Sequence, residues 1–186
     1  MRLETERLLL RLPEPTDVDA FAPFFADPEV VRYTGGKTRT RRETGEILRR
    51  MGEHWDRHGC GLFVVVQKED ERPIGRVGIL IWDGDSWTHA LARAPRGRVE
   101  HEIGWTFGRA YWGQGFATEA AVTVRDWALD GLGLPRLISL IQQGNDASVR
   151  VALKLGEALE RENMPGPFVG ATDLYSLAPA GNGPAR

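Results

Sequence analysis

The feature that most constrains the fold is a turn with two glycines, Gly113-Gln114-Gly115, between an apolar segment and a helical pattern. Residues 99–107 read as a strand, and small apolar residues recur at helical spacing from Gly115 to Gly131. Glycine permits a sharp bend that brings N–H groups close to a ligand, and the helix start adds unpaired N–H groups and a positive dipole end. The pattern predicts strand, turn and helix in direct succession, with either a phosphate on the turn or a tight turn without a ligand.

Two other phosphate-binding motifs do not fit this turn. A P-loop places a Lys-Ser/Thr pair after its second glycine, whereas Phe116-Ala117 follows Gly115 here. The dinucleotide fingerprint GxGxxG requires a third glycine, and Thr118 stands at that position. Nucleoside triphosphates and dinucleotides are therefore disfavoured as ligands.

The rest of the chain contains both strand and helix patterns. Strands are predicted at 7–12, 62–66, 74–82, 99–107 and 137–141, and helices at 18–25, 42–57, 115–131 and 146–155. The early strands read as hairpins and the later ones alternate with helices, which predicts an α/β (α+β) fold with a sheet of mixed direction. Residues 83–98 lack periodicity and are expected to form a long, mobile surface loop. One domain is expected over 1–178, followed by a disordered tail at 179–186.

Composition limits the ligand class and the compartment. A formal charge of -2 gives no general attraction to nucleic acid, so an anionic ligand needs a local site. Cys60 is the one cysteine and its neighbours lack metal-ligand spacing, so we expect no disulfide and no metal. The acidic N-terminal residues before Leu8-Leu9-Leu10 are unlike a secretory signal or a membrane span. A cytoplasmic protein without membrane contact is expected.

Short segments along the chain occur in a distinctive order. They are Glu4-Thr5-Glu6-Arg7-Leu8-Leu9-Leu10-Arg11, Glu102-Ile103-Gly104-Trp105, the run from Tyr111 to Ala120, Asn145-Asp146-Ala147-Ser148, Lys154-Leu155-Gly156 and Asp173-Leu174-Tyr175-Ser176-Leu177. Each segment alone is weak evidence for any family, but the ordered set resembles the GNAT acetyltransferase superfamily. It is most similar to the branch of ribosomal-protein N-terminal acetyltransferases of the RimJ/RimL type.

The resemblance implies a fold and a cofactor. The fold is a twisted, mostly antiparallel sheet flanked by helices and splayed beside its central strand, with acetyl-coenzyme A (acetyl-CoA) in the gap. The glycine loop holds the pyrophosphate through backbone N–H groups, although Trp112 stands where the family pattern has Gln or Arg. Independently of the family, Asn145 is suited to cap a helix. The implied acetyl-CoA-binding residues are Thr106, Phe107, Trp112, Gln114, Gly115, Phe116, Ala117, Thr118, Asn145 and Ser148.

The resemblance also implies catalytic groups. Acetyl transfer needs a proton acceptor for the amine and a proton for the departing thiolate. Glu102 matches a catalytic glutamate of several family members and is the candidate general base, acting through water; an exposed strand residue is the alternative. Ser148 is the candidate general acid, with Tyr111 and Tyr175 as substitutes. His101 is expected at the surface on the opposite face of the strand from Glu102.

The predicted activity is direct transfer of an acetyl group from acetyl-CoA to a primary amine. The branch favours a protein N-terminal α-amine, and a small amine such as an antibiotic, a polyamine or an amino acid derivative is the alternative. A basic protein acceptor would predict an acidic cleft, for which Glu43, Glu46 and Glu53 are available. A non-catalytic acyl-CoA-binding module is a further alternative. The resemblance also allows a homodimer.

Overall fold

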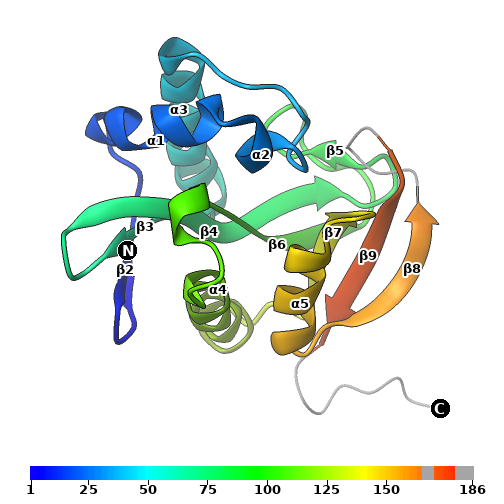
Figure 1. Cartoon of the computed structure of the whole chain (residues 1–186). Helices are drawn as coiled ribbons and strands as arrows, with labels where there is room; N and C mark the ends of the chain where they lie inside the picture. Colours follow the sequence, from blue (N-terminus) through cyan, green and yellow to red (C-terminus); the bar gives the residue numbers. More distant parts are fainter. Residues whose placement is uncertain (165–169, 179–186) are drawn as a thin grey trace.

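The computed structural model describes residues 1–164 and 170–178, which form one twisted sheet with helices on both faces (Figure 1). The strand order is β1-β2-β3-β4-β6-β7-β9-β8, and β5 pairs with β4. The strands are β1 (Arg2–Glu4), β2 (Leu8–Arg11), β3 (Leu62–Gln67), β4 (Arg72–Asp83), β5 (Thr88–His89), β6 (Val99–Phe107), β7 (Leu137–Gln142), β8 (Ala158–Met164) and β9 (Thr172–Leu177). The α-helices are α1 (Val18–Ala26), α2 (Pro28–Val31), α3 (Arg41–His58), α4 (Phe116–Asp126) and α5 (Asp146–Lys154).

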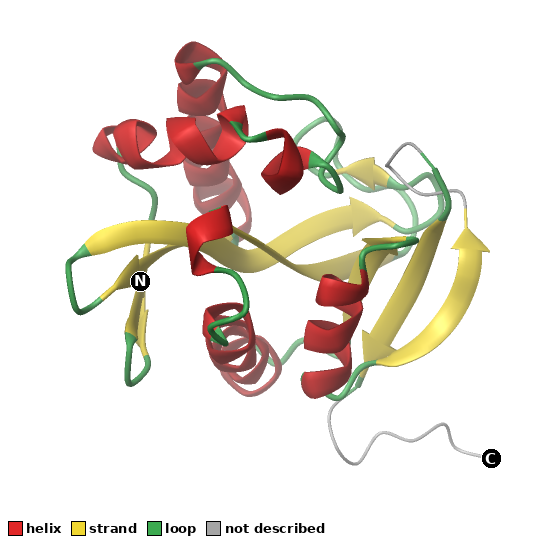
Figure 2. Ribbon diagram, in the orientation of Figure 1, coloured by secondary structure: helices red, strands yellow, loops and turns green. Residues whose placement is uncertain are grey.

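The helices divide between the two faces of the sheet (Figure 2). On one face, Phe21 of α1 and Met51 of α3 pack in a cluster with Val64 of β3. On the other face, Val124 of α4 packs in the largest cluster with Ile103 of β6. Because β3 is covered on both sides, its sequence is apolar almost throughout, as expected for a buried strand.

The predicted mixed direction of the sheet is confirmed. β6 and β7 run parallel, and the other neighbouring strands run antiparallel. The β6–β7 pairing has one register pair, Glu102 with Ile138, whereas β4 and β6 pair from Gly75–Phe107 to Asp83–Val99. The predicted splay beside the central strand is this fork between β6 and β7.

Four strands and one α-helix of the structure were not predicted from the sequence: β1, β5, β8, β9 and α2. Residues 83–98 contain β5, and the buried Asp83 carboxylate accepts hydrogen bonds from the N–H groups of Ser86 and Arg96 at 3.0 and 2.8 Å. These bonds join both ends of the segment, so it is a closed hairpin rather than a loop without structure. Strand β8 was not predicted, because it is an edge strand whose side chains are exposed except at Met164.

The predicted tail at 179–186 lies outside the described residues. Within 1–164 and 170–178, no helix combines the length and the apolar character needed to cross a membrane.

Candidate active site

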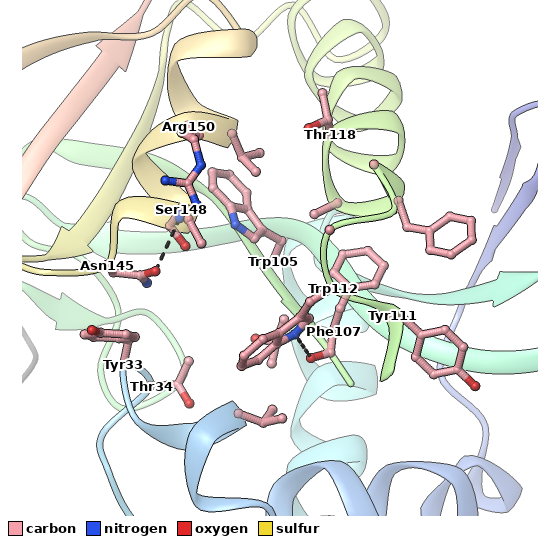
Figure 3. Close-up of a pocket in the computed structure, with 18 of the residues that line it drawn as sticks. Tyr33, Thr34, Trp105, Phe107, Tyr111, Trp112, Thr118, Asn145, Ser148 and Arg150 are labelled. Carbon is pink, nitrogen blue, oxygen red and sulfur yellow. Dashed lines mark hydrogen bonds between the residues drawn. The ribbon is translucent and has the colours of Figure 1, made fainter. Parts of the chain in front are cut away.

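A cavity of about 460 Å³ opens beside the fork between β6 and β7 and is called the large cavity below. It lies between the end of β6, the loop that leads into α4, and α5 (Figure 3). The structure brings together in its wall every predicted cofactor-binding residue except Gln114. The predicted residues found in the cavity wall are Thr106, Phe107, Trp112, Gly115, Phe116, Ala117, Thr118, Asn145 and Ser148.

The glycine loop presents its backbone to the large cavity. Gly113 and Gly115 have φ angles of +74° and +83°, a region that favours glycine. A Cβ placed on Gly113 would meet no atom within 4 Å, so the space above it is open. Gly115 is also the N-cap of α4 and has no side chain to satisfy the N–H groups of the first turn. The loop therefore fits a phosphate group held by backbone N–H donors.

Basic side chains surround the same cavity. Arg32, Arg150 and Lys154 line it, and Glu29 is the one acidic residue in its wall. The Glu29 carboxylate lies 3.6 Å from the Arg32 guanidinium, so these two charges form an ion pair. The excess of positive charge favours an anionic ligand such as a pyrophosphate. The sequence motif of the glycine loop did not predict these basic residues.

A second cavity of about 260 Å³, the small cavity, adjoins the large one. Tyr33, Thr34, Trp105, Thr106, Asn145 and Ser148 line both cavities. Side chains found in the small cavity alone include Arg76, Trp82, His89 and Glu102. The two cavities meet at β6, where a ligand in one can react with a ligand in the other.

Glu102 is a buried carboxyl group in the wall of the small cavity, not the exposed strand residue considered as the alternative. Its side chain is 6% exposed, and its carboxylate accepts hydrogen bonds from the Trp82 indole at 2.6 Å and from the backbone N–H of Leu140. Burial raises the pKa of Glu102 to about 7, although both hydrogen bonds and Arg76 oppose this rise. A carboxyl group that titrates near neutral pH is suited to general base catalysis.

Residues 7–157 match the family model described as the Acetyltransferase (GNAT) domain. The chain belongs to the GNAT acetyltransferase family. It is 30% identical over 150 residues to the uncharacterized N-acetyltransferase p20 of Bacillus licheniformis, an alignment that covers 80% of this chain and 78% of p20. It is therefore an acetyltransferase by family, as the ordered sequence segments predicted.

Solved structures of family members share the fold. A GNAT-family acetyltransferase from Bacillus anthracis has a TM-score of 0.77 and 24% identity, and covers 96% of this chain and 98% of its own. RimL, a ribosomal L7/L12 α-N-protein acetyltransferase in complex with coenzyme A, has a TM-score of 0.75 and 14% identity, with coverage of 96% and 98%. The likeness to RimL shows that the two chains share a fold.

In this GNAT chain, the N-terminal segment braces the glycine loop. The Glu119 carboxylate in the first turn of α4 accepts hydrogen bonds from Thr5 Oγ1 at 2.5 Å and Arg7 Nε at 2.7 Å. Arg7 Nη1 also donates to the carbonyl of Gln114 at 3.1 Å, and its guanidinium lies 4.4 Å from the centre of the Phe116 ring. Two of the family-like segments, far apart in sequence, are thus in direct contact. Gln114 belongs to this brace rather than to the cavity wall.

Trp112 replaces the usual family residue and also makes a backbone contact. Its indole Nε1 donates to the carbonyl of Phe107 at 2.8 Å (Figure 3). The side chain is 48% exposed and lies in the wall of the large cavity. Trp112 therefore ties the loop to the end of β6 and leaves one lone pair of that carbonyl for a further hydrogen bond.

The predicted helix cap at Asn145 is confirmed. Asn145 Oδ1 accepts a hydrogen bond from the backbone N–H of Ser148 at 3.3 Å, which fixes the start of α5 at the cavity (Figure 3). Tyr33, which sequence reasoning missed, donates through its hydroxyl to the carbonyl of Gly144 at 2.9 Å. This bond connects the segment after α2 to the turn before α5.

The other predicted side chains divide between the site and the rest of the fold. Tyr111 lines the large cavity, whereas Tyr175 packs with Ile141 in a separate core cluster. His101 is half-buried rather than at the surface and lines neither cavity. Missed residues such as Trp82 lie on strands without a motif, so no sequence signal separated them from core residues.

A buried polar chain supports the fork between β6 and β7. Ser139 Oγ lies 3.1 Å from the carbonyl oxygen of Ile103 and 3.1 Å from Glu157 Oε1. One hydroxyl proton serves only one of these acceptors, so both contacts are hydrogen bonds only when Glu157 is protonated and donates to Ser139. Burial, with a smaller contribution from Glu102, raises the pKa of Glu157 to about 8. Glu157 is therefore largely neutral at neutral pH.

This arrangement predicts how Glu157→Gln changes stability with pH. A carboxyl group whose pKa is raised by folding makes the wild type lose stability as pH rises from about 4.5 to about 8. Glutamine cannot ionise and still donates to Ser139. The variant is expected to gain stability relative to wild type across that range, by an amount on the order of 1–3 kcal/mol. Urea unfolding near both limits measures the difference, and a constant difference would contradict a neutral Glu157.

Proposed function

We propose that this acetyltransferase is an acetyl-CoA-dependent N-acetyltransferase that acts on a primary amine. The observation that supports it most is the meeting of two cavities at β6. The large cavity has the glycine loop and basic residues, and the small cavity has the buried Glu102. Acetyl-CoA bound in the large cavity supplies an activated acetyl group, and an amine in the small cavity reaches it across Thr106.

Named residues can hold acetyl-CoA in this arrangement. The N–H groups of the first turn of α4 and the side chains of Arg150 and Lys154 hold the phosphates. The apolar wall formed by Trp105 and Phe116 contacts the pantetheine arm. The complex of RimL with coenzyme A, on the same fold, supports this ligand.

Glu102 is the proposed general base and Ser148 the proposed general acid. Glu102 accepts a proton from the ammonium form of the acceptor through a water molecule, so that the amine becomes a nucleophile. Ser148 lines both cavities at the start of α5 and donates a proton to the departing thiolate. A thiol pKa near 8.5 lets water replace that donor, so loss of Ser148 lowers the rate less than loss of Glu102.

The candidate acceptors are a protein N-terminal α-amine and a small-molecule amine. A protein N-terminal α-amine is the acceptor that the name of RimL indicates for RimL itself. The acidic residues considered for a basic protein acceptor line neither cavity. Glu43 bonds to Thr40, Glu46 pairs with Arg42 and Glu53 pairs with Arg49, all on or next to α3.

Release of coenzyme A measures the proposed activity. Purified protein is mixed with acetyl-CoA and a panel of N-terminal peptides, amino acids and polyamines, and the free thiol is followed over time. We expect thiol release that depends on the presence of one class of amine. Acetyl-CoA binding without release for any amine would instead support the acyl-CoA-binding module.

A further inference from the structure

The small cavity contains an arginine, Arg76, that forms no ion pair with a described residue, although the carboxylate of Glu102 is close enough to interact with its charge. Arg76 lies on β4, with its guanidinium 4.9 Å from the centre of the Phe25 ring and Nη1 4.0 Å from the Met51 sulfur. Within residues 1–164 and 170–178, no carboxylate oxygen lies within 4 Å of it. An arginine has five N–H donors, and these contacts leave most of them unsatisfied. Because Arg76 is only partly buried and lines the small cavity, its free donors are accessible to an anionic ligand there.

Arg76 remains charged despite its surroundings. Burial lowers its pKa to about 10, so the guanidinium is protonated at neutral pH. The other ionisable side chains in the wall of the small cavity are Tyr33, His89 and Glu102. Burial lowers the pKa of His89 to about 4, so this ring is neutral at the same pH. The cavity therefore contains one fixed positive charge and one carboxyl group that titrates.

The sheet places Arg76 and Glu102 at opposite ends of one open strip. Arg76 pairs with Thr106 across the β4–β6 ladder, and Leu80 pairs with Glu102. These alternate residues lie on one face of the sheet, and the two pairs are about 13 Å apart along the backbone, although the long Arg76 side chain still counteracts the rise that burial causes in the pKa of Glu102. Gly104 lies between Glu102 and Thr106 and has no side chain, and the Leu80 side chain, 3.9 Å from where a Gly104 Cβ would stand, borders the strip. A molecule with an amine near Glu102 and an anion near Arg76 fits this arrangement.

We propose that Arg76 binds an anionic group of the acceptor, so that the preferred substrate is a primary amine that also carries a carboxylate or a phosphate. The planar guanidinium suits two-point binding of either group. A polyamine or a basic peptide places a second positive charge against Arg76 and is disfavoured. The inference rests on the proposed N-acetyltransferase function and specifies its acceptor.

Matched acceptor pairs test this proposal. Each pair consists of an amine with an acidic group and the same amine with that group removed or amidated, drawn from free amino acids, from aminophosphonates and from short peptides with acidic second residues. We expect wild type to show a kcat/KM at least about tenfold higher for the acidic member, mainly through KM. Comparison of the free compounds with the peptides identifies the source of the anion.

Arg76→Met removes the charge while keeping an apolar side chain of similar length, and Arg76→Lys keeps the charge. The preference for the acidic member is expected to disappear in Arg76→Met and to return in part in Arg76→Lys. Arg72→Met removes an exposed arginine from the same strand, paired with Asp70, and is expected to keep the preference. An equal preference in wild type and Arg76→Met, or a wild-type preference for neutral or cationic amines, would overturn the proposal.

A binding measurement separates this proposal from the proposed function. With coenzyme A present, the acidic member of each pair is expected to raise the Tm of wild type and Arg72→Met more than that of Arg76→Met. Acidic amines that raise the Tm without being acetylated would refute the transfer reaction and leave the role of Arg76 supported. Acetylation of amines with no dependence on Arg76 in either measurement would refute the role of Arg76 alone.

Discussion

Glu102→Gln is expected to lower kcat for acetyl transfer by about 100-fold or more, the usual size of a general base contribution. Glutamine keeps the volume of the buried side chain, so the packing around residue 102 is retained. It cannot accept the proton that the amine must lose. Steady-state rates at saturating acetyl-CoA measure the change, and the Kd of acetyl-CoA serves as the control for the fold. A variant with wild-type kcat would remove Glu102 from the mechanism.

The pH profile identifies the group more closely. Since burial raises the pKa of Glu102 to about 7, the carboxyl group is protonated and inactive below this value, and kcat/KM rises as pH increases through it. In Glu102→Gln the part of the rise that is due to the carboxyl group is expected to disappear. A rise caused by deprotonation of the acceptor amine would remain. Trp82→Phe removes a hydrogen bond that stabilises the carboxylate, so its profile is expected to shift to higher pH. Identical profiles in all three proteins would contradict this assignment.

Gly115→Trp is expected to weaken acetyl-CoA binding by about 100-fold or more, because a large side chain blocks the start of α4 where the phosphates bind. Gly115 has a φ of +83°, so a side chain there strains the backbone, and its Cβ would lie in ordinary contact with Arg7 Nη2 at 3.5 Å. Calorimetric titration of acetyl-CoA measures the loss.

A matched control separates blocked binding from backbone strain. Gly133 has a φ of +66°, and a Cβ there would meet no atom within 4 Å. Gly133→Trp therefore carries a similar backbone cost, about 1–2 kcal/mol, at a site outside both cavities. Its affinity for acetyl-CoA is expected to match wild type. Equal losses in both variants would mean that strain, not the loop, explains the effect.

The strand, turn and helix around the glycine loop could be predicted because short-range rules determine them. Gly113 and Gly115 adopt positive φ angles, and Asn145 caps α5 through its side chain. The burial of Glu102 was harder to predict, since an acid in an apolar strand fits either face. Its environment depends on Trp82, which is distant in sequence and becomes a neighbour only through the β4–β6 ladder.

The acceptor side could not be predicted from a motif. Arg76 lies in an ordinary strand pattern, and its unpaired state follows from what α1 and α3 place around it, a ring and a thioether rather than a carboxylate. The basic residues of the large cavity could not be predicted either. In the sequence, Arg150 and Lys154 are typical of a solvated helix face, and only the fork between β6 and β7 places them in the cavity wall. Tertiary contacts, not local sequence, give these residues their functional meaning.

Product identification by mass spectrometry tests the central claim most directly. Wild type is incubated with acetyl-CoA carrying a labelled acetyl group and with the amine that releases the most thiol, and the amine is then analysed. The proposed mechanism predicts one labelled acetyl group on the amine nitrogen for each coenzyme A released, and very little with Glu102→Gln. Binding of acetyl-CoA by well-folded protein without any labelled amine would contradict it.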